Sequence, residues 1–154
     1  MALKNFTRAG ISDLLSRAVS GSGGAADLRL MLLETIPGDI QAVANAGALD
    51  VPDDTSYSSS YANGLAVTSV AVAIDATNNL VKITGDAMTF TGVTGAENVV
   101  GVALIRFDTN LAGSMVWAVY DTTDFVADGN NIIVSPSATW GYFGFGINAT
   151  TVPA

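Results

Sequence analysis

The chain has 154 residues and a formal net charge of −8, and it contains neither cysteine nor histidine. The sequence therefore excludes disulfides, thiolate nucleophiles, Ser-His-Asp triads and metal-imidazole sites. Hydrophobic residues make up 49 % of the chain and charged residues only 13 %, so a disordered chain is not expected. The neutral surface that remains suits a protein covered by neighbours in an assembly, with a very stable monomer as the alternative.

No targeting segment is predicted. Arg8, Asp13 and Arg17 interrupt every window in which the apolar run of a signal peptide would fall. No apolar segment reaches the roughly 18 residues of a membrane span. We expect a chain made and kept in a cytoplasm, or packed into a particle assembled there, with no membrane partner.

The first predicted element is a basic helical arm with a linker, residues 1–26. An apolar stripe at i, i+3, i+4 and i+7 predicts a short helix, and 20–26 (SGSGGAA) has the composition of a flexible linker. The stripe consists of Ile11, Leu14, Leu15 and Ala18. Residues 1–29 carry a net charge of +2 and residues 30–154 carry −10. Such an arm either folds back on its own body or reaches another subunit.

Residues 27–154 are predicted to form one mainly β domain. Apolar and β-branched runs separated by turn residues indicate an antiparallel β-sandwich, and about eight strands would suit a jelly roll. The predicted strands are 28–36, 65–76, 80–84, 87–93, 98–107, 114–121, 131–135 and 140–147. The first of them is apolar on both faces, as a buried strand would be.

Two segments between the first strands are less regular. Residues 39–50 have low β propensity and predict a short helix or an irregular loop. Residues 51–64 are turn-rich and polar, which places Tyr57 and Tyr61 on a surface or an edge. Four aromatics in the later strands are expected to fill the core, with a sugar-stacking platform as the alternative. They are Trp117, Trp140, Phe143 and Phe145.

Carboxylates are the one chemical group left for catalysis or metal binding. Asp121, Asp124 and Asp128 fall within eight residues and could bind calcium, but their spacing is not that of an EF-hand and suits turn formation equally. Asp53-Asp54 and Glu97 are the other candidates, and nothing in the sequence pairs them across a cleft. The glycine-rich stretch 92–101 lacks the lysine and helix of a phosphate loop. We expect no enzyme, no cofactor, no metal and no nucleic-acid partner.

The order of these segments resembles the head decoration (cement) proteins of tailed bacteriophages. The resemblance covers roughly 28–147 and lies in pattern, without a diagnostic motif. The stretches that carry it are LRLMLLETI (28–36), YANGLAVTSVAVAI (61–74), LVKITGDAMTFTGVTG (80–95), VVGVALIRFDT (99–109), MVWAVYD (115–121) and WGYFGFG (140–146). It implies a jelly-roll-like virion structural protein on the capsid exterior, made in the bacterial host cytoplasm. The implied partners are the major capsid protein and further copies of the chain, with a trimer favoured and a dimer possible.

Under this resemblance the arm becomes the partner-binding element. Its apolar side chains would bury on a capsid subunit or a neighbouring copy, and its basic side chains would face acidic groups there. These residues are Lys4, Phe6, Arg8, Ile11, Leu14, Leu15 and Arg17. The alternatives are a receptor- or glycan-binding module of a tail or baseplate, using Tyr57, Tyr61 or Trp140, and a tail-tube or neck component.

Overall fold

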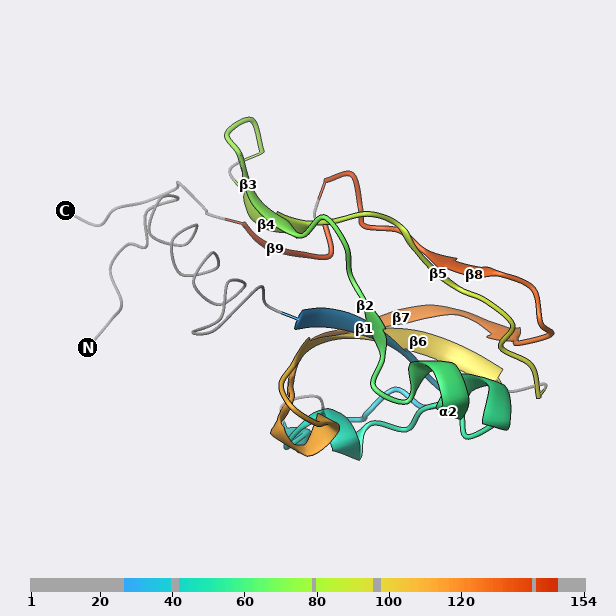
Figure 1. Cartoon of the computed structure of the whole chain (residues 1–154). Coiled ribbons are helices and arrows are strands. Elements are labelled where there is room, and N and C mark those ends of the chain that lie inside the picture. The colour runs from blue at the N-terminus through green and yellow to red at the C-terminus, as the bar shows by residue number, and fades with distance from the viewer. Residues whose placement is uncertain (1–26, 40–41, 79, 96–97, 140, 147–154) are drawn as a thin grey trace. The chain divides into compact units, whose positions relative to one another are not determined.

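The computed structural model of the chain describes residues 27–39, 42–78, 80–95, 98–139 and 141–146 (Figure 1). Its described residues are mainly β, with antiparallel strands and one short α-helix, α2 (Thr55–Tyr61). They belong to two compact units. The large unit is Asp27–Val67 with Ala87–Val134, and the small unit includes Thr68–Asp86 and the described residues from Ser135 onward.

The large unit is built on a four-stranded antiparallel sheet in the order β2-β1-β6-β7. Its strands are β1 (Asp27–Leu33), β2 (Leu65–Ala66), β6 (Asn98–Phe107) and β7 (Met115–Val126). A separate two-stranded sheet pairs β5 (Met88–Phe90) with β8 (Ile132–Val134), as Figure 1 shows. Two 3-10 turns, η2 (Ala46–Ala48) and η3 (Leu111–Gly113), complete the unit.

Strand β1 is buried on both faces, which confirms the prediction from its continuous apolar run. Leu28 is 1 % exposed and every residue from Leu30 to Leu33 is 0 % exposed. Because side chains alternate along a strand, Met31 and Leu33 point to one face and Leu28, Leu30 and Leu32 to the other. Six buried residues form the core on the first face: Met31, Leu33, Ala46, Leu49, Ala103 and Ile105. The turn η2 therefore packs against this face of the sheet.

The two edges of β1 have very different partners. One edge pairs with β6 along its whole length, from Asp27 opposite Phe107 to Leu33 opposite Gly101. The other edge faces β2, which has only two residues and lies opposite Arg29 and Leu30. The hydrogen bonds beyond this short pairing come from single groups. Backbone groups that are buried without a partner are costly, so these single bonds are essential to the strand.

Three such bonds complete the second edge of β1. On one side of β2, the Val67 N–H donates to the Leu28 carbonyl at 2.8 Å. On the other side, the buried Leu32 N–H donates to the Tyr57 hydroxyl at 3.1 Å. The Glu34 N–H then donates to the Asp50 carbonyl at 3.1 Å. A helix side chain and a loop carbonyl thus take the place of a longer strand.

Helix α2 holds Tyr57 in position. Asp54 caps its N-terminus by accepting hydrogen bonds from the N–H groups of Ser56 (2.6 Å) and Tyr57 (3.4 Å). Tyr57 and Tyr61 lie at i and i+4, so both point inward, where Tyr57 stacks on Phe90 with 6.3 Å between ring centroids. The Tyr61 ring meets Phe90 edge-on at 5.0 Å, and its hydroxyl accepts from the Thr91 N–H.

Gly64 lets the chain return from α2 to β2. Its φ of +75° lies in the left-handed region that favours glycine. A Cβ atom here would lie 2.8 Å from the Leu30 carbonyl oxygen and 3.0 Å from the Met31 side chain. The close approach of this turn to β1 therefore requires glycine, which has no side chain, at position 64.

The small unit contains a three-stranded antiparallel sheet in the order β3-β4-β9. Its strands are β3 (Ala71–Asp75), β4 (Leu80–Thr84) and β9 (Phe143–Gly146). Val81 and Ile83 are fully buried, whereas Lys82 between them is half-buried and points to the other face.

Hydrogen bonds to Asp86 connect the two ends of the Thr68–Asp86 segment. The Thr68 and Ser69 hydroxyls donate to one Asp86 carboxylate oxygen at 2.8 and 2.6 Å, and the Asp86 N–H donates to the Thr68 carbonyl at 3.0 Å. The Tyr142 hydroxyl donates to the Asp86 carbonyl. Ser69 has a left-handed φ of +54°, which is uncommon for a residue with a side chain. The hydrogen bonds from Ser69 and Thr68 lower the pKa of the Asp86 carboxyl.

Several sequence predictions need correction. Residues 51–64 contain α2 and not only turns, because Asp54 caps a helix there and buries its two tyrosines. The predicted strand 65–76 is interrupted between β2 and β3, where Ser69 takes its left-handed conformation. The predicted strand 114–121 continues to Val126. The described strands form antiparallel sheets of four, three and two strands, in agreement with the predicted mainly β antiparallel fold.

Tyr57→Phe should destabilise the large unit. The substitution keeps the ring but leaves the buried Leu32 N–H without its acceptor, which costs about 1–3 kcal/mol of unfolding free energy. Urea unfolding of the two proteins measures the difference. Ser60→Ala, which removes an exposed hydroxyl from the same helix, is the control and should change stability by less than about 0.5 kcal/mol. A Phe variant as stable as the control would show that the second edge of β1 does not need Tyr57.

Asp86→Asn should alter how the small unit responds to acid. Because folding lowers the pKa of Asp86 below its ordinary value of 3.8, the ionised carboxylate stabilises the fold above that pH. This contribution is lost as the pH falls from 3.8 through the lower pKa of the folded state. The stability advantage of the natural protein over the Asn variant should therefore shrink in strong acid. Urea unfolding followed through NMR signals of β3 and β4 tests this, and parallel pH profiles would contradict it.

Candidate functional site

The arm residues proposed for partner binding lie outside the described residues. They are Lys4, Phe6, Arg8, Ile11, Leu14, Leu15 and Arg17. The arm role stays a prediction from the sequence.

Positive charge in the described part of the chain is mostly engaged in structural contacts. The Arg29 guanidinium lies 3.7 Å from the centroid of the Phe107 ring and donates to the Asn63 carbonyl at 3.2 Å. Lys82 is held in a polar cluster, described next. Arg106 is exposed on β6. Two of the three basic side chains in the described residues thus make internal contacts. Acidic side chains therefore dominate the described surface.

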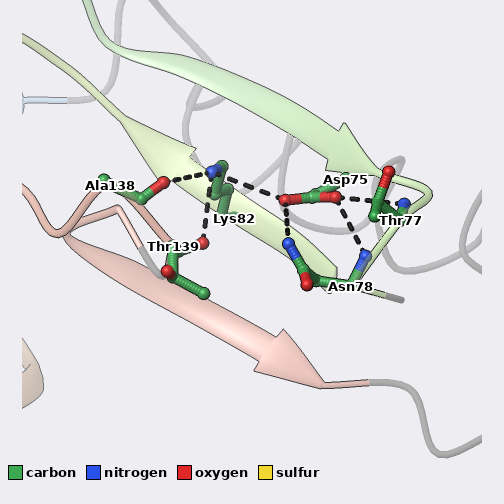
Figure 2. Close-up of polar contacts among 6 residues, drawn as sticks. All are labelled: Asp75, Thr77, Asn78, Lys82, Ala138 and Thr139. Carbon is green, nitrogen blue, oxygen red and sulfur yellow. Dashed lines mark hydrogen bonds and ion pairs between the residues drawn. The ribbon is translucent and has the colours of Figure 1, made fainter.

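Figure 2 shows the polar cluster around Lys82 in the small unit. The Lys82 ammonium donates to the carbonyls of Ala138 (2.8 Å) and Thr139 (3.1 Å) and lies 3.9 Å from an Asp75 carboxylate oxygen. Asp75 also accepts from Asn78, at its side-chain amide (2.9 Å) and its backbone N–H (3.0 Å). The side-chain hydrogen bond from Asn78 is the main cause that lowers the pKa of Asp75. These contacts stabilise the β3–β4 turn and connect it to residues 138–139. The cluster therefore has a structural role.

The aromatic residues do not form an exposed platform in the part of the chain that is described. Tyr57 is 0 % and Tyr61 8 % exposed, so their predicted surface position is wrong. Their hydroxyls bond the backbone and their rings pack on Phe90, which explains the burial. Trp117 and Phe143 are half-buried. The side chains of Trp140 and Phe145 lie outside the described residues.

The candidate carboxylates are dispersed. Asp121 and Asp124 are exposed on β7, and Asp128 accepts from the N–H and side-chain amide of Asn130, as a turn-former does. Among the described residues no group of three or more acidic side chains could hold a metal ion. Asp54 caps α2, and Asp53 is exposed beside it. Glu97 lies outside the described residues.

The feature that most favours binding is the outer edge of the four-stranded sheet. β7 is the last strand of this sheet and, among the described strands, pairs only with β6. Three large apolar side chains along it are exposed: Met115 (56 %), Tyr120 (38 %) and Val126 (55 %). We define these residues, together with Asp121 and Asp124, as the β7 edge surface. Elsewhere Ile74 on β3 and Ile133 on β8 are also exposed.

Two irregularities interrupt the pairing of β7 with β6. They lie between Val99 and Gly101 and between Leu104 and Ile105 of β6, and the extra residues are on β7, within 121–125 and 116–118. Bulges and charged residues are the means by which natural sheet edges avoid pairing with further strands. The β7 edge is therefore poorly suited to accept a long regular strand, although its apolar side chains remain exposed.

The sequence alone did not single out the β7 edge surface. The prediction ended this strand at Asp121, and so left out Asp124 and Val126. Phe125 and Val126 after the polar stretch 121–124 are the signal that could have extended it. Which strand lies at the sheet edge could not be read from the sequence, because strand order depends on long-range pairing.

Comparison of the chain with known protein families, with characterised proteins and with solved structures finds no match. No helix within the described residues is long and apolar enough to cross a membrane.

Proposed function

We propose that the chain is a non-enzymatic virion structural protein that binds the outer surface of a tailed-phage capsid and stabilises it. Its partner is the major capsid protein, and it acts as a homo-oligomer, with a trimer favoured over a dimer. In this proposal residues 27–154 make a jelly-roll-like sandwich and residues 1–26 make the anchoring arm. The protein is made in the bacterial host cytoplasm and ends on the capsid exterior.

The observation that carries this proposal is the β7 edge surface. We take the large exposed apolar side chains on this sheet edge as the mark of an interaction site. Met115 and Val126 are both more than half exposed and lie at the two ends of β7. The carboxylates of Asp121 and Asp124 between them favour a partner with basic groups.

The internal use of tyrosines and basic residues supports a structural role over a ligand-binding one. The buried tyrosines cannot stack on a sugar, which weakens the receptor- or glycan-binding alternative. The dispersed carboxylates are solvated, cap a helix or form turns, so the proposal includes no catalysis, metal or cofactor. A tail-tube or neck component remains the second candidate, because it too would need exposed interfaces between copies.

A decoration protein stabilises a shell through binding linkage. If the chain binds the assembled shell and not the separated subunits, each bound copy shifts the equilibrium toward the intact shell. The arm would contribute by burying Leu14, Leu15 and other apolar side chains. Burial contributes about 1.5–3 kcal/mol for each large apolar side chain, and it must exceed the entropy lost when the arm becomes ordered.

Co-sedimentation with phage heads tests the function. Expanded heads of the phage that encodes the chain, stripped of their small outer proteins, are mixed with increasing amounts of the full chain. We expect saturable binding at a fixed ratio to the capsid subunit. Leu14→Ser combined with Leu15→Ser should weaken binding at least about tenfold, because two buried leucines are lost.

Ser16→Ala is the matched control for the arm and should bind like the natural chain. Assembly of the purified chain into rings or tubes, with no binding to heads, would replace the proposal with the tail-tube or neck component. Equal binding by the leucine variant and the control would remove the anchoring role from the arm.

A further inference from the structure

The turn between α2 and β2 contains Asn63–Gly64, the only Asn-Gly pair in the sequence. An asparagine side chain reacts most readily with the backbone nitrogen of the next residue when that residue is glycine, because glycine has no Cβ to hinder the approach. Every other asparagine of the chain is followed by a residue with a side chain. Asn63 is exposed, so water reaches its side-chain amide. The local sequence therefore makes Asn63 the most reactive asparagine of the chain.

The reaction at such a pair is deamidation through a cyclic imide. The Gly64 nitrogen loses its proton and attacks the carbon of the Asn63 side-chain amide, so that a new C–N bond forms. The side-chain nitrogen takes up the proton and leaves as ammonia. Water then opens the ring at one of its two carbonyls, which gives aspartate or isoaspartate. Water is thus the only other reactant.

The folded chain holds the peptide group between Asn63 and Gly64 at both of its polar atoms. The Gly64 N–H donates to the Tyr61 carbonyl at 2.7 Å, and the Asn63 carbonyl accepts from the Arg29 guanidinium at 3.2 Å. Gly64 also lies so close to β1 that a Cβ atom on it would be 2.8 Å from the Leu30 carbonyl oxygen. The attacking nitrogen is therefore fixed in place and its proton is held in a hydrogen bond. The reaction requires that the turn first moves away from β1.

We propose that Asn63 is a deamidation site that the folded chain protects and that reacts when the second edge of β1 opens. The turn leads directly into β2, which pairs with this edge, and the bond from the Leu32 N–H to the Tyr57 hydroxyl lies further along the same edge. An opening that breaks these contacts frees the Gly64 nitrogen. When opening and closing are fast, the reaction rate follows the fraction of chains in which the edge is open.

Isoaspartate at position 63 would hinder the edge from closing again. It adds one atom to the backbone just before β2, whose pairing with β1 consists of Leu65 and Ala66. That pairing, and the bond from the Val67 N–H to the Leu28 carbonyl, depend on the length of the turn. The reaction is irreversible, so modified chains accumulate with the time that the edge has spent open.

Mass spectrometry of peptides from the full chain tests the protection. The folded chain and the chain unfolded in guanidinium chloride are incubated at the same mildly alkaline pH, and fragmentation locates the deamidated residues. Position 63 should react first in the unfolded chain and at least about tenfold more slowly in the folded chain, because reaction there requires the loss of two hydrogen bonds together. Asn63→Gln should abolish the fast reaction in the unfolded chain. Equal rates at position 63 in the folded and unfolded chains would overturn the proposal.

Tyr57→Phe tests whether opening at β1 controls the reaction. At a temperature where the variant is folded, loss of the acceptor for the Leu32 N–H should speed deamidation at position 63 by about fivefold or more. Ser60→Ala, on the same helix, is the matched control and should react like the natural chain. All three chains should react equally in denaturant, which separates opening from a direct effect on the chemistry. Equal rates in the two folded variants would overturn the link between Asn63 and the edge of β1.

Discussion

The large unit depends on how the second edge of β1 is satisfied. This strand is buried on both faces, so each of its backbone groups needs a partner within the protein. On one side β6 provides a full ladder, but on the other β2 is only two residues long. The Val67 amide, the Tyr57 hydroxyl and the Asp50 carbonyl complete that edge. The tight turn at Gly64 and the Asp54 cap of α2 contribute to this edge because they bring these groups to β1.

This arrangement also determines what remains for function. Tyr57 and Tyr61, which could otherwise stack on a ligand, are used inside the large unit, and Arg29 and Lys82 are held by internal contacts. The described surface is consequently acidic and presents few basic side chains to a partner. Of the five large apolar side chains that are exposed in the described part of the chain, three lie on β7, the last strand of the main sheet.

Much of the strand content could be predicted from the sequence. The bounds of β4 and β6 match the prediction, since β-branched residues and turn signals define them locally. Helix α2 was missed because serines and tyrosines are poor helix formers, and its tertiary contacts with β1 and Phe90 override that propensity. The spacing of Tyr57 and Tyr61 was the available signal. The edge position of β7 could not be predicted, because it results from pairings between residues far apart in the chain.

The measurement that most directly tests the proposed role is cryo-electron microscopy of expanded phage heads with and without the added full chain. The account predicts extra density at regularly repeated positions on the outer surface of the heads that received the chain. Density confined to the neck or tail, or no added density, would contradict a capsid decoration protein.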